Sequence, residues 1–171
     1  MPLQKAARLA PPATATKYTG SPADSWQRLG LALVLFGLAG VIGNVWATRR
    51  IGTAGPTSNV TLSLWSMCAG MLVLAAAGAS WAGFVLGALA WGGGVFANNS
   101  SQQARLVAAS PALAGASIAL NTSMIYLGQA IGTSLGGAVI AGSSYSTLPV
   151  VGAVVLLAAL ALSWRAERRN R

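Results

Sequence analysis

Histidine is absent from this chain, and acidic residues are nearly absent. The two acids, Asp24 and Glu167, lie near opposite ends of the sequence. General acid–base catalysis, a catalytic triad and a transition-metal site all need side chains that the long interior of the sequence lacks. We therefore expect no enzyme activity, no catalytic residue, no metal site and no cofactor.

Cysteine and charge are also scarce. Cys68 is the single cysteine and lies inside an apolar run, which excludes a disulfide framework and a cysteine-ligated metal. Charged residues make up 8% of the 171 residues, whereas 54% are apolar, and the mean hydropathy is +0.62. This composition predicts an all-α integral membrane protein.

The few charges are mostly positive and give a net charge of +9. They flank the apolar runs, as residues that anchor a protein against anionic lipid headgroups do. The lipid bilayer is therefore the expected partner, and nucleic acid is not. The N-terminus lacks the short apolar core of a signal peptide, so none is expected.

Apolar runs long enough to cross a bilayer follow one another along most of the chain. A disordered tail is expected over residues 1–20, where Ala, Pro and Thr dominate. A five-helix transmembrane domain is expected over residues 21–171. Polar loops are expected at Gly52–Thr57 and Asn98–Ser110, and either close packing or a bend at Trp91–Gly94. The five expected spans are about 29–48, 58–79, 82–98, 111–142 and 147–164.

Arginines indicate how such spans would be oriented. With five spans, seven arginines share one side, which the positive-inside rule assigns to the cytoplasm, with the N-terminus outside. The basic residues near the N-terminus, from Lys5 to Arg28, fit this orientation poorly. The seven arginines are Arg49, Arg50, Arg105, Arg165, Arg168, Arg169 and Arg171.

The fourth span carries a polar stripe although it contains no charge. Thr122, Tyr126 and Gln129 are spaced i, i+4 and i+7, so they share one face of a helix, and Asn121 lies next to them. A helix that faces only lipid has no use for such a stripe, whereas one that lines a watery cavity does. These four residues are the candidate contacts of a small-molecule substrate.

The same polar residues allow a second interpretation. Asn121, Tyr126 and Gln129 could instead join neighbouring helices by hydrogen bonds, which contribute about 0.6 kcal/mol each on average in a membrane. The sequence leaves both interpretations open.

Glycines form a further pattern on two of the spans. Gly128, Gly132 and Gly136 recur every four residues, and Gly40 and Gly43 lie close together in the first span. Small residues at such spacing let a neighbouring helix approach closely. We expect these five glycines to serve helix packing.

Three segments resemble a known family. Phe36–Asn44, followed by Arg49 and Arg50, is similar to helix 8 of the major facilitator superfamily. Gln103–Leu106 and the run Leu120–Gly132 resemble its loop 10–11 and helix 11. The group most similar is the bacterial drug:proton antiporters, including arabinose-efflux-type permeases.

This resemblance implies that the five spans are helices 8 to 12 of a secondary-active efflux carrier in the bacterial inner membrane. Such a carrier exports small molecules by alternating access, and this chain would be incomplete without the N-terminal half or a second copy. The resemblance also implies that the second and fifth spans, which are the plainest, face lipid. The alternative is a non-transporting membrane fragment, or a small assembly or regulatory subunit of a membrane complex.

Overall fold

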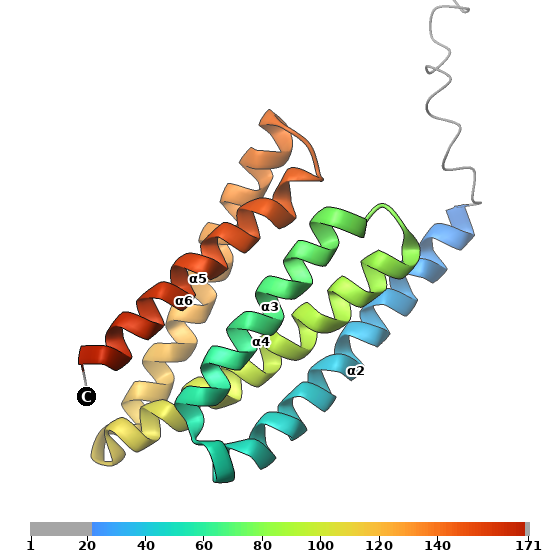
Figure 1. The fold of residues 1–171 in the computed structure, drawn as a ribbon. Helices are drawn as coiled ribbons and strands as arrows, with labels where there is room; N and C mark the ends of the chain where they lie inside the picture. The colour runs from blue at the N-terminus through green and yellow to red at the C-terminus, as the bar shows by residue number, and fades with distance from the viewer. Residues whose placement is uncertain (1–21, 170–171) are drawn as a thin grey trace, which may run out of the picture. The chain divides into compact units, whose positions relative to one another are not determined.

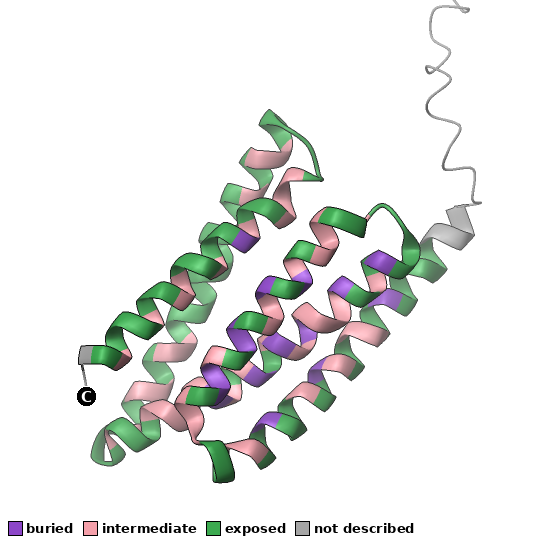
Figure 2. Ribbon diagram, in the orientation of Figure 1, coloured by how far each residue is buried: buried purple, intermediate pink, exposed green. Residues whose placement is uncertain are grey.

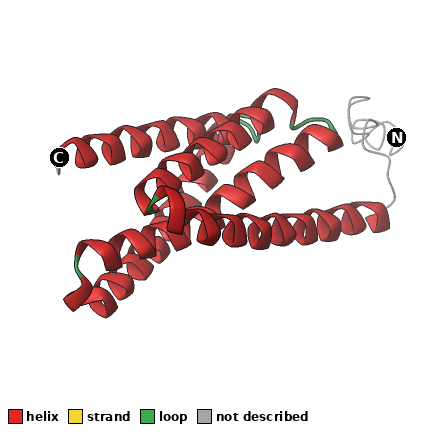
Figure 3. Cartoon of the chain, turned by 60° about the horizontal axis from the view of Figure 1, so that its bottom comes forward, coloured by secondary structure: helices red, strands yellow, loops and turns green. Residues whose placement is uncertain are grey.

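The computed structural model describes the backbone of residues 22–169 and the side chains of residues 26–168. Within that range the chain is helical apart from short connections and contains no strand (Figure 3). This confirms the all-α class. The tail expected over residues 1–20 lies outside the described residues.

Five long helices and one short 3-10 turn make up the described chain (Figure 1). Four of the helices are long and apolar enough to cross a membrane, namely α2, α3, α5 with its 3-10 turn, and α6. The elements are α2 (Pro22–Ala54), α3 (Pro56–Ala77), α4 (Trp81–Ala109), η3 (Pro111–Leu113), α5 (Ala114–Gly142) and α6 (Thr147–Arg169).

The fifth helix, α4, is not among these four candidate membrane-spanning helices. Its first half is rich in glycine and carries two tryptophans, and its second half is polar. It nevertheless packs along α3. The chain reverses direction between the two helices, and Ser80 caps α4 by accepting a hydrogen bond from the Gly83 N–H at 3.0 Å. A 29-residue helix measures about 43 Å. Helix α4 is therefore long enough to run beside the whole of α3, in the opposite direction (Figure 1).

Two of the expected loops are wrong. The first shrinks to Gly55, whose φ of 78° lies in the left-handed region that suits glycine, and Pro56 then starts α3. The second, Asn98–Ser110, is helical as far as Ala109. Its Gln, Ala, Arg and Leu residues are strong helix formers, and Ser101 donates to the Ala97 carbonyl at 2.6 Å instead of breaking the helix.

At Trp91–Gly94, where close packing or a bend was expected, α4 is unbroken. The glycines serve close packing there. A Cβ at Gly92 would lie 2.6 Å from the Phe36 ring, and one at Gly94 would lie 2.9 Å from the Ser63 carbonyl oxygen.

The chain divides into two units, residues 1–31 and 32–171. In the first, the described residues 22–31 form the start of α2. In the second, α3 packs against both α4 and α6, and buried residues concentrate on α3 and α4 (Figure 2). Asn59 and Val60 of α3 are completely buried, whereas Leu62, Trp65 and Leu72 are exposed, so one side of the second span packs against other helices and the other side stays open.

Candidate functional site

The helix that carries the predicted polar stripe is the least covered of the five described helices. Helix α5 follows the 3-10 turn and contacts α4 and α6. None of its residues is buried, whereas α3 and α4 each bury several. The polar stripe therefore lies on a helix that is largely open along its length.

Four serine and threonine hydroxyl groups of α5 donate hydrogen bonds to carbonyls of their own helix. Thr122 donates to the Ile118 carbonyl at 3.0 Å, and Thr133 donates to the Gln129 carbonyl at 2.8 Å. Ser123 and Ser134 bond in the same way to the residues four positions earlier, at 3.0 and 2.9 Å. Such back-bonding lets a hydroxyl face lipid at little cost. The Thr122 hydroxyl is therefore stable without contact to water.

The amide and phenol groups behave differently. Asn121 is half-buried, and its Nδ2 group has no hydrogen-bond partner in the described chain. Tyr126 is 66% exposed and Gln129 is exposed, and neither side chain has a hydrogen bond to any described residue. Polar groups without a hydrogen-bond partner, whether buried as the Asn121 Nδ2 atom is or exposed as the other two are, need water, a ligand or another helix. Asn121, Tyr126 and Gln129 therefore form the candidate site, with Thr122 beside them.

Four of the five glycines predicted to serve packing fall into two groups. A Cβ at Gly40 would lie 2.5 Å from the Phe96 ring, and one at Gly43 would overlap the backbone of Gly93. By contrast, Gly128 and Gly132 have no described atom that would contact an added Cβ.

Gly136, the fifth of these glycines, belongs to neither group, because an added Cβ would have a neighbour but no overlap. A Cβ there would be 3.6 Å from Leu148 Cδ2, an ordinary van der Waals contact. The first span thus uses its glycines against α4, and α5 leaves most of its glycine face open.

Sequence analysis missed two polar links between helices. The Asn59 side chain of α3 donates from Nδ2 to the Ala47 carbonyl of α2 at 2.8 Å. Arg105, expected in a loop, lies on α4 with Nη1 3.4 Å from Ser163 Oγ on α6. Neither link has a sequence signal, because hydrogen bonding between distant helices follows no local pattern.

The described residues contain no group of three His, Cys, Asp or Glu side chains that could hold a metal ion. The candidate site therefore acts through neutral hydrogen-bonding groups. These can orient a small polar or amphipathic molecule but supply no acid or base.

Comparison with known proteins gives partial matches. The chain is 36% identical over 89 residues to the inner membrane transport protein YdhP of Escherichia coli strain K12, which covers 52% of this chain and 23% of that protein. It is 38% identical over 81 residues to the protein of the same name from E. coli O157:H7, covering 47% and 21%. The matches thus span less than a quarter of each relative's length. No family model and no solved structure matches.

Proposed function

We propose that this chain is part of a secondary-active carrier of the major facilitator superfamily in the bacterial inner membrane. The carrier exports small molecules by alternating access, as a drug:proton antiporter does. The matched relatives are inner membrane transport proteins by name, and the apolar helices suit a multi-pass carrier.

The observation that carries the proposal is the set of polar side chains on α5 that lack a hydrogen-bond partner. Asn121, Tyr126 and Gln129 offer donors and acceptors that no described residue satisfies. In carriers, substrate sites lie near the bilayer midplane between two packed halves. Gln129 lies near the middle of α5, at the depth that such a site requires.

The other half of the site must then come from outside this face of the chain. We propose that the N-terminal half of the carrier, or a second copy of this chain, packs against α5. The empty surroundings of Gly128 and Gly132 are consistent with a neighbour that approaches the backbone closely.

The arginine-rich end of the helices would face the cytoplasm. Arg50, Arg105 and Arg165 lie near the C-terminal ends of α2, α4 and α6, and these three helices run in the same direction through the second unit (Figure 1). The positive-inside rule assigns this end to the cytoplasm.

Cysteine labelling tests the proposal. In a Cys68→Ala background, Gln129→Cys should react with a membrane-impermeant thiol reagent much faster than Val154→Cys on α6. The two positions are matched because both side chains are exposed in the chain, yet only position 129 would meet cavity water. Equal rates at the two positions would place both in lipid or both in water, and would contradict a cavity at α5.

A second candidate function rests on the same glycine face. The open Gly128 and Gly132 positions also suit a small membrane subunit that packs on a larger partner and transports nothing. The labelling experiment separates the two, since a packed α5 face would protect Gln129→Cys whichever side receives the reagent.

A further inference from the structure

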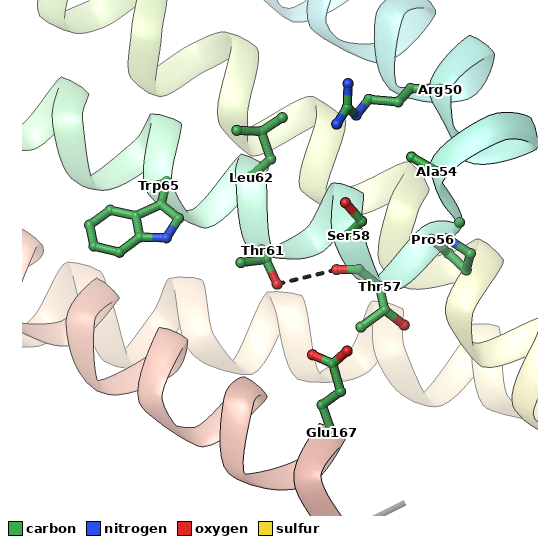
Figure 4. A pocket seen from close by; sticks show the side chains of 10 residues that line it. Arg50, Ala54, Pro56, Thr57, Ser58, Thr61, Leu62, Trp65 and Glu167 are labelled. Carbon is green, nitrogen blue, oxygen red and sulfur yellow. Dashed lines mark hydrogen bonds between the residues drawn. The ribbon is translucent and has the colours of Figure 1, made fainter. Parts of the chain in front are cut away.

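A polar cavity lies at the arginine-rich end of the second unit, away from the α5 face. Its volume is about 570 Å³, and it is lined by the end of α2, the start of α3 and the end of α6 (Figure 4). Arg50 forms one side, and Glu167 of α6 lies across from it, beyond Thr57 and Ser58. No part of the proposed transport mechanism uses this cavity.

Arg50 is the one positively charged side chain among the described residues that line this cavity. Its Nε atom is buried and has no hydrogen-bond partner in the described chain. Its guanidinium lies 5.3 Å from the centre of the Trp46 ring, which holds the planar group in place. A guanidinium fixed in this way presents paired N–H donors that match the oxygens of a phosphate.

The start of α3 adds to the positive potential. Helix α3 begins at Pro56 in the cavity wall, and no side chain caps its first turn. The N–H groups of a first helical turn lack intrahelical partners and carry partial positive charge. The Thr61 hydroxyl is already used, because it donates to the Thr57 carbonyl at 3.3 Å. Arg50 and these N–H groups together favour an anionic oxygen.

An apolar groove lies next to this cavity. Its volume is about 730 Å³, and its walls are α2, α3 and α4. Its two hydroxyls are already bonded: Ser63 donates to the Asn59 carbonyl at 2.7 Å, and Ser66 to the Ala90 carbonyl at 2.8 Å. The groove therefore offers no free hydroxyl and suits a hydrocarbon.

The groove and the polar cavity adjoin one another. Leu62 lines both, and Trp46 lines the groove while its ring lies against Arg50. From Leu35 to Trp46 the groove follows α2 for about 16 Å at 1.5 Å per residue. One leaflet is half of a hydrocarbon core of roughly 30 Å, which is about 15 Å.

We infer that the cavity and the groove together bind one phospholipid from the leaflet at the arginine-rich end. Its phosphate lies at Arg50 and the first turn of α3, and one acyl chain lies along the groove between α2 and α3. The match of groove length to one leaflet and the adjoining cation favour a phospholipid over a second helix, which would bring no phosphate to Arg50. This lipid site is independent of the α5 face.

Native mass spectrometry of the purified 171-residue chain, titrated with dioleoyl phosphatidylglycerol, tests the site through two matched pairs of variants. Arg50→Gln should weaken binding of the first lipid about tenfold, the effect of losing a hydrogen bond to a charged group. Arg49→Gln removes the same charge from an exposed neighbour that lines neither cavity, and should leave the first binding step unchanged.

The second pair of variants tests the groove, and it tests the lipid site even if Arg50→Gln does not fold. Ile42→Trp fills the groove and should weaken lipid binding. Val41→Trp adds the same bulk at an exposed adjacent position outside the groove, and should not. Equal weakening within either pair would overturn the inference.

Two further ligands separate the phosphate from the acyl chain. Dioleoylglycerol, which lacks the phosphate, should bind about tenfold more weakly than the phospholipid. Inorganic phosphate alone should not displace the lipid. Equal affinity for the two lipids, or displacement by phosphate, would overturn the inference. So would loss of a dimer in Ile42→Trp, because it would assign the groove to a second copy.

Discussion

Three glycines on α2 meet very different surroundings, and alanine substitutions should rank them. A Cβ at Gly37 would meet nothing within 4 Å. One at Gly40 would meet the Phe96 ring at 2.5 Å, and one at Gly43 would overlap the backbone of Gly93, with the Gly93 Cα at 2.8 Å. A ring can move aside, but a helix backbone cannot do so without separating the helices.

The expected magnitudes follow from two opposing effects. Alanine in place of glycine inside a helix gains about 1 kcal/mol at each position. Overpacking at a close contact costs about 1–3 kcal/mol. Gly37→Ala should therefore stabilise the chain by about 1 kcal/mol, since it adds no overlap. Gly43→Ala should be about 1–3 kcal/mol less stable than Gly37→Ala, with Gly40→Ala between them.

Thermal unfolding in detergent measures this ranking. Cys68 is the single cysteine and is buried on α3, so a fluorogenic thiol reagent reports when the helices separate. At about 2–4 °C per kcal/mol, the midpoint of Gly43→Ala should lie about 6 °C below that of Gly37→Ala. Equal midpoints would refute the close approach of α2 and α4.

Two further predictions concern the link between α2 and α3 and the orientation in the membrane. Asn59→Ala should lower stability by about 0.6–1.7 kcal/mol in the same assay, because it removes the bond to the Ala47 carbonyl, whereas exposed Asn44→Ala should change it little. Reporter fusions at Gln102 and after Arg171 should report cytoplasm and a fusion at Ser144 the outside; a cytoplasmic signal at Ser144 would contradict the proposed orientation.

The existence of the helices could be predicted from hydropathy, but their ends could not. Apolarity indicates which part of a helix contacts lipid, but it does not indicate whether the helix continues into water. Helix α4 continues past Asn98 to Ala109 because residues such as Gln103 and Leu106 favour helix outside the bilayer as well. The Gly92–Gly94 cluster predicted either close packing or a bend, and only the structure shows that these glycines pack closely, against Phe36 and Met67.

Glycine spacing predicted close approach without identifying the partner. Gly43 and Gly128 lie in equally good patterns, yet only Gly43 has a neighbour among the described residues. Contacts between distant segments depend on the tertiary arrangement, which a local pattern does not specify. The cavity at Arg50 is a stronger example, because Glu167 reaches it from the far end of the chain.

The α5 stripe shows which polar residues of a membrane helix carry information about function. Thr122 and Gln129 share a face in the sequence, and both look equally polar there. In the structure the Thr122 hydroxyl is satisfied by the Ile118 carbonyl, so it would be stable in lipid, whereas the Gln129 side chain has no such partner. An amide cannot reach its own helix backbone as easily as a hydroxyl can. The requirement for water, substrate or a second helix therefore rests on Asn121, Tyr126 and Gln129, and a test of the site should vary these three before Thr122.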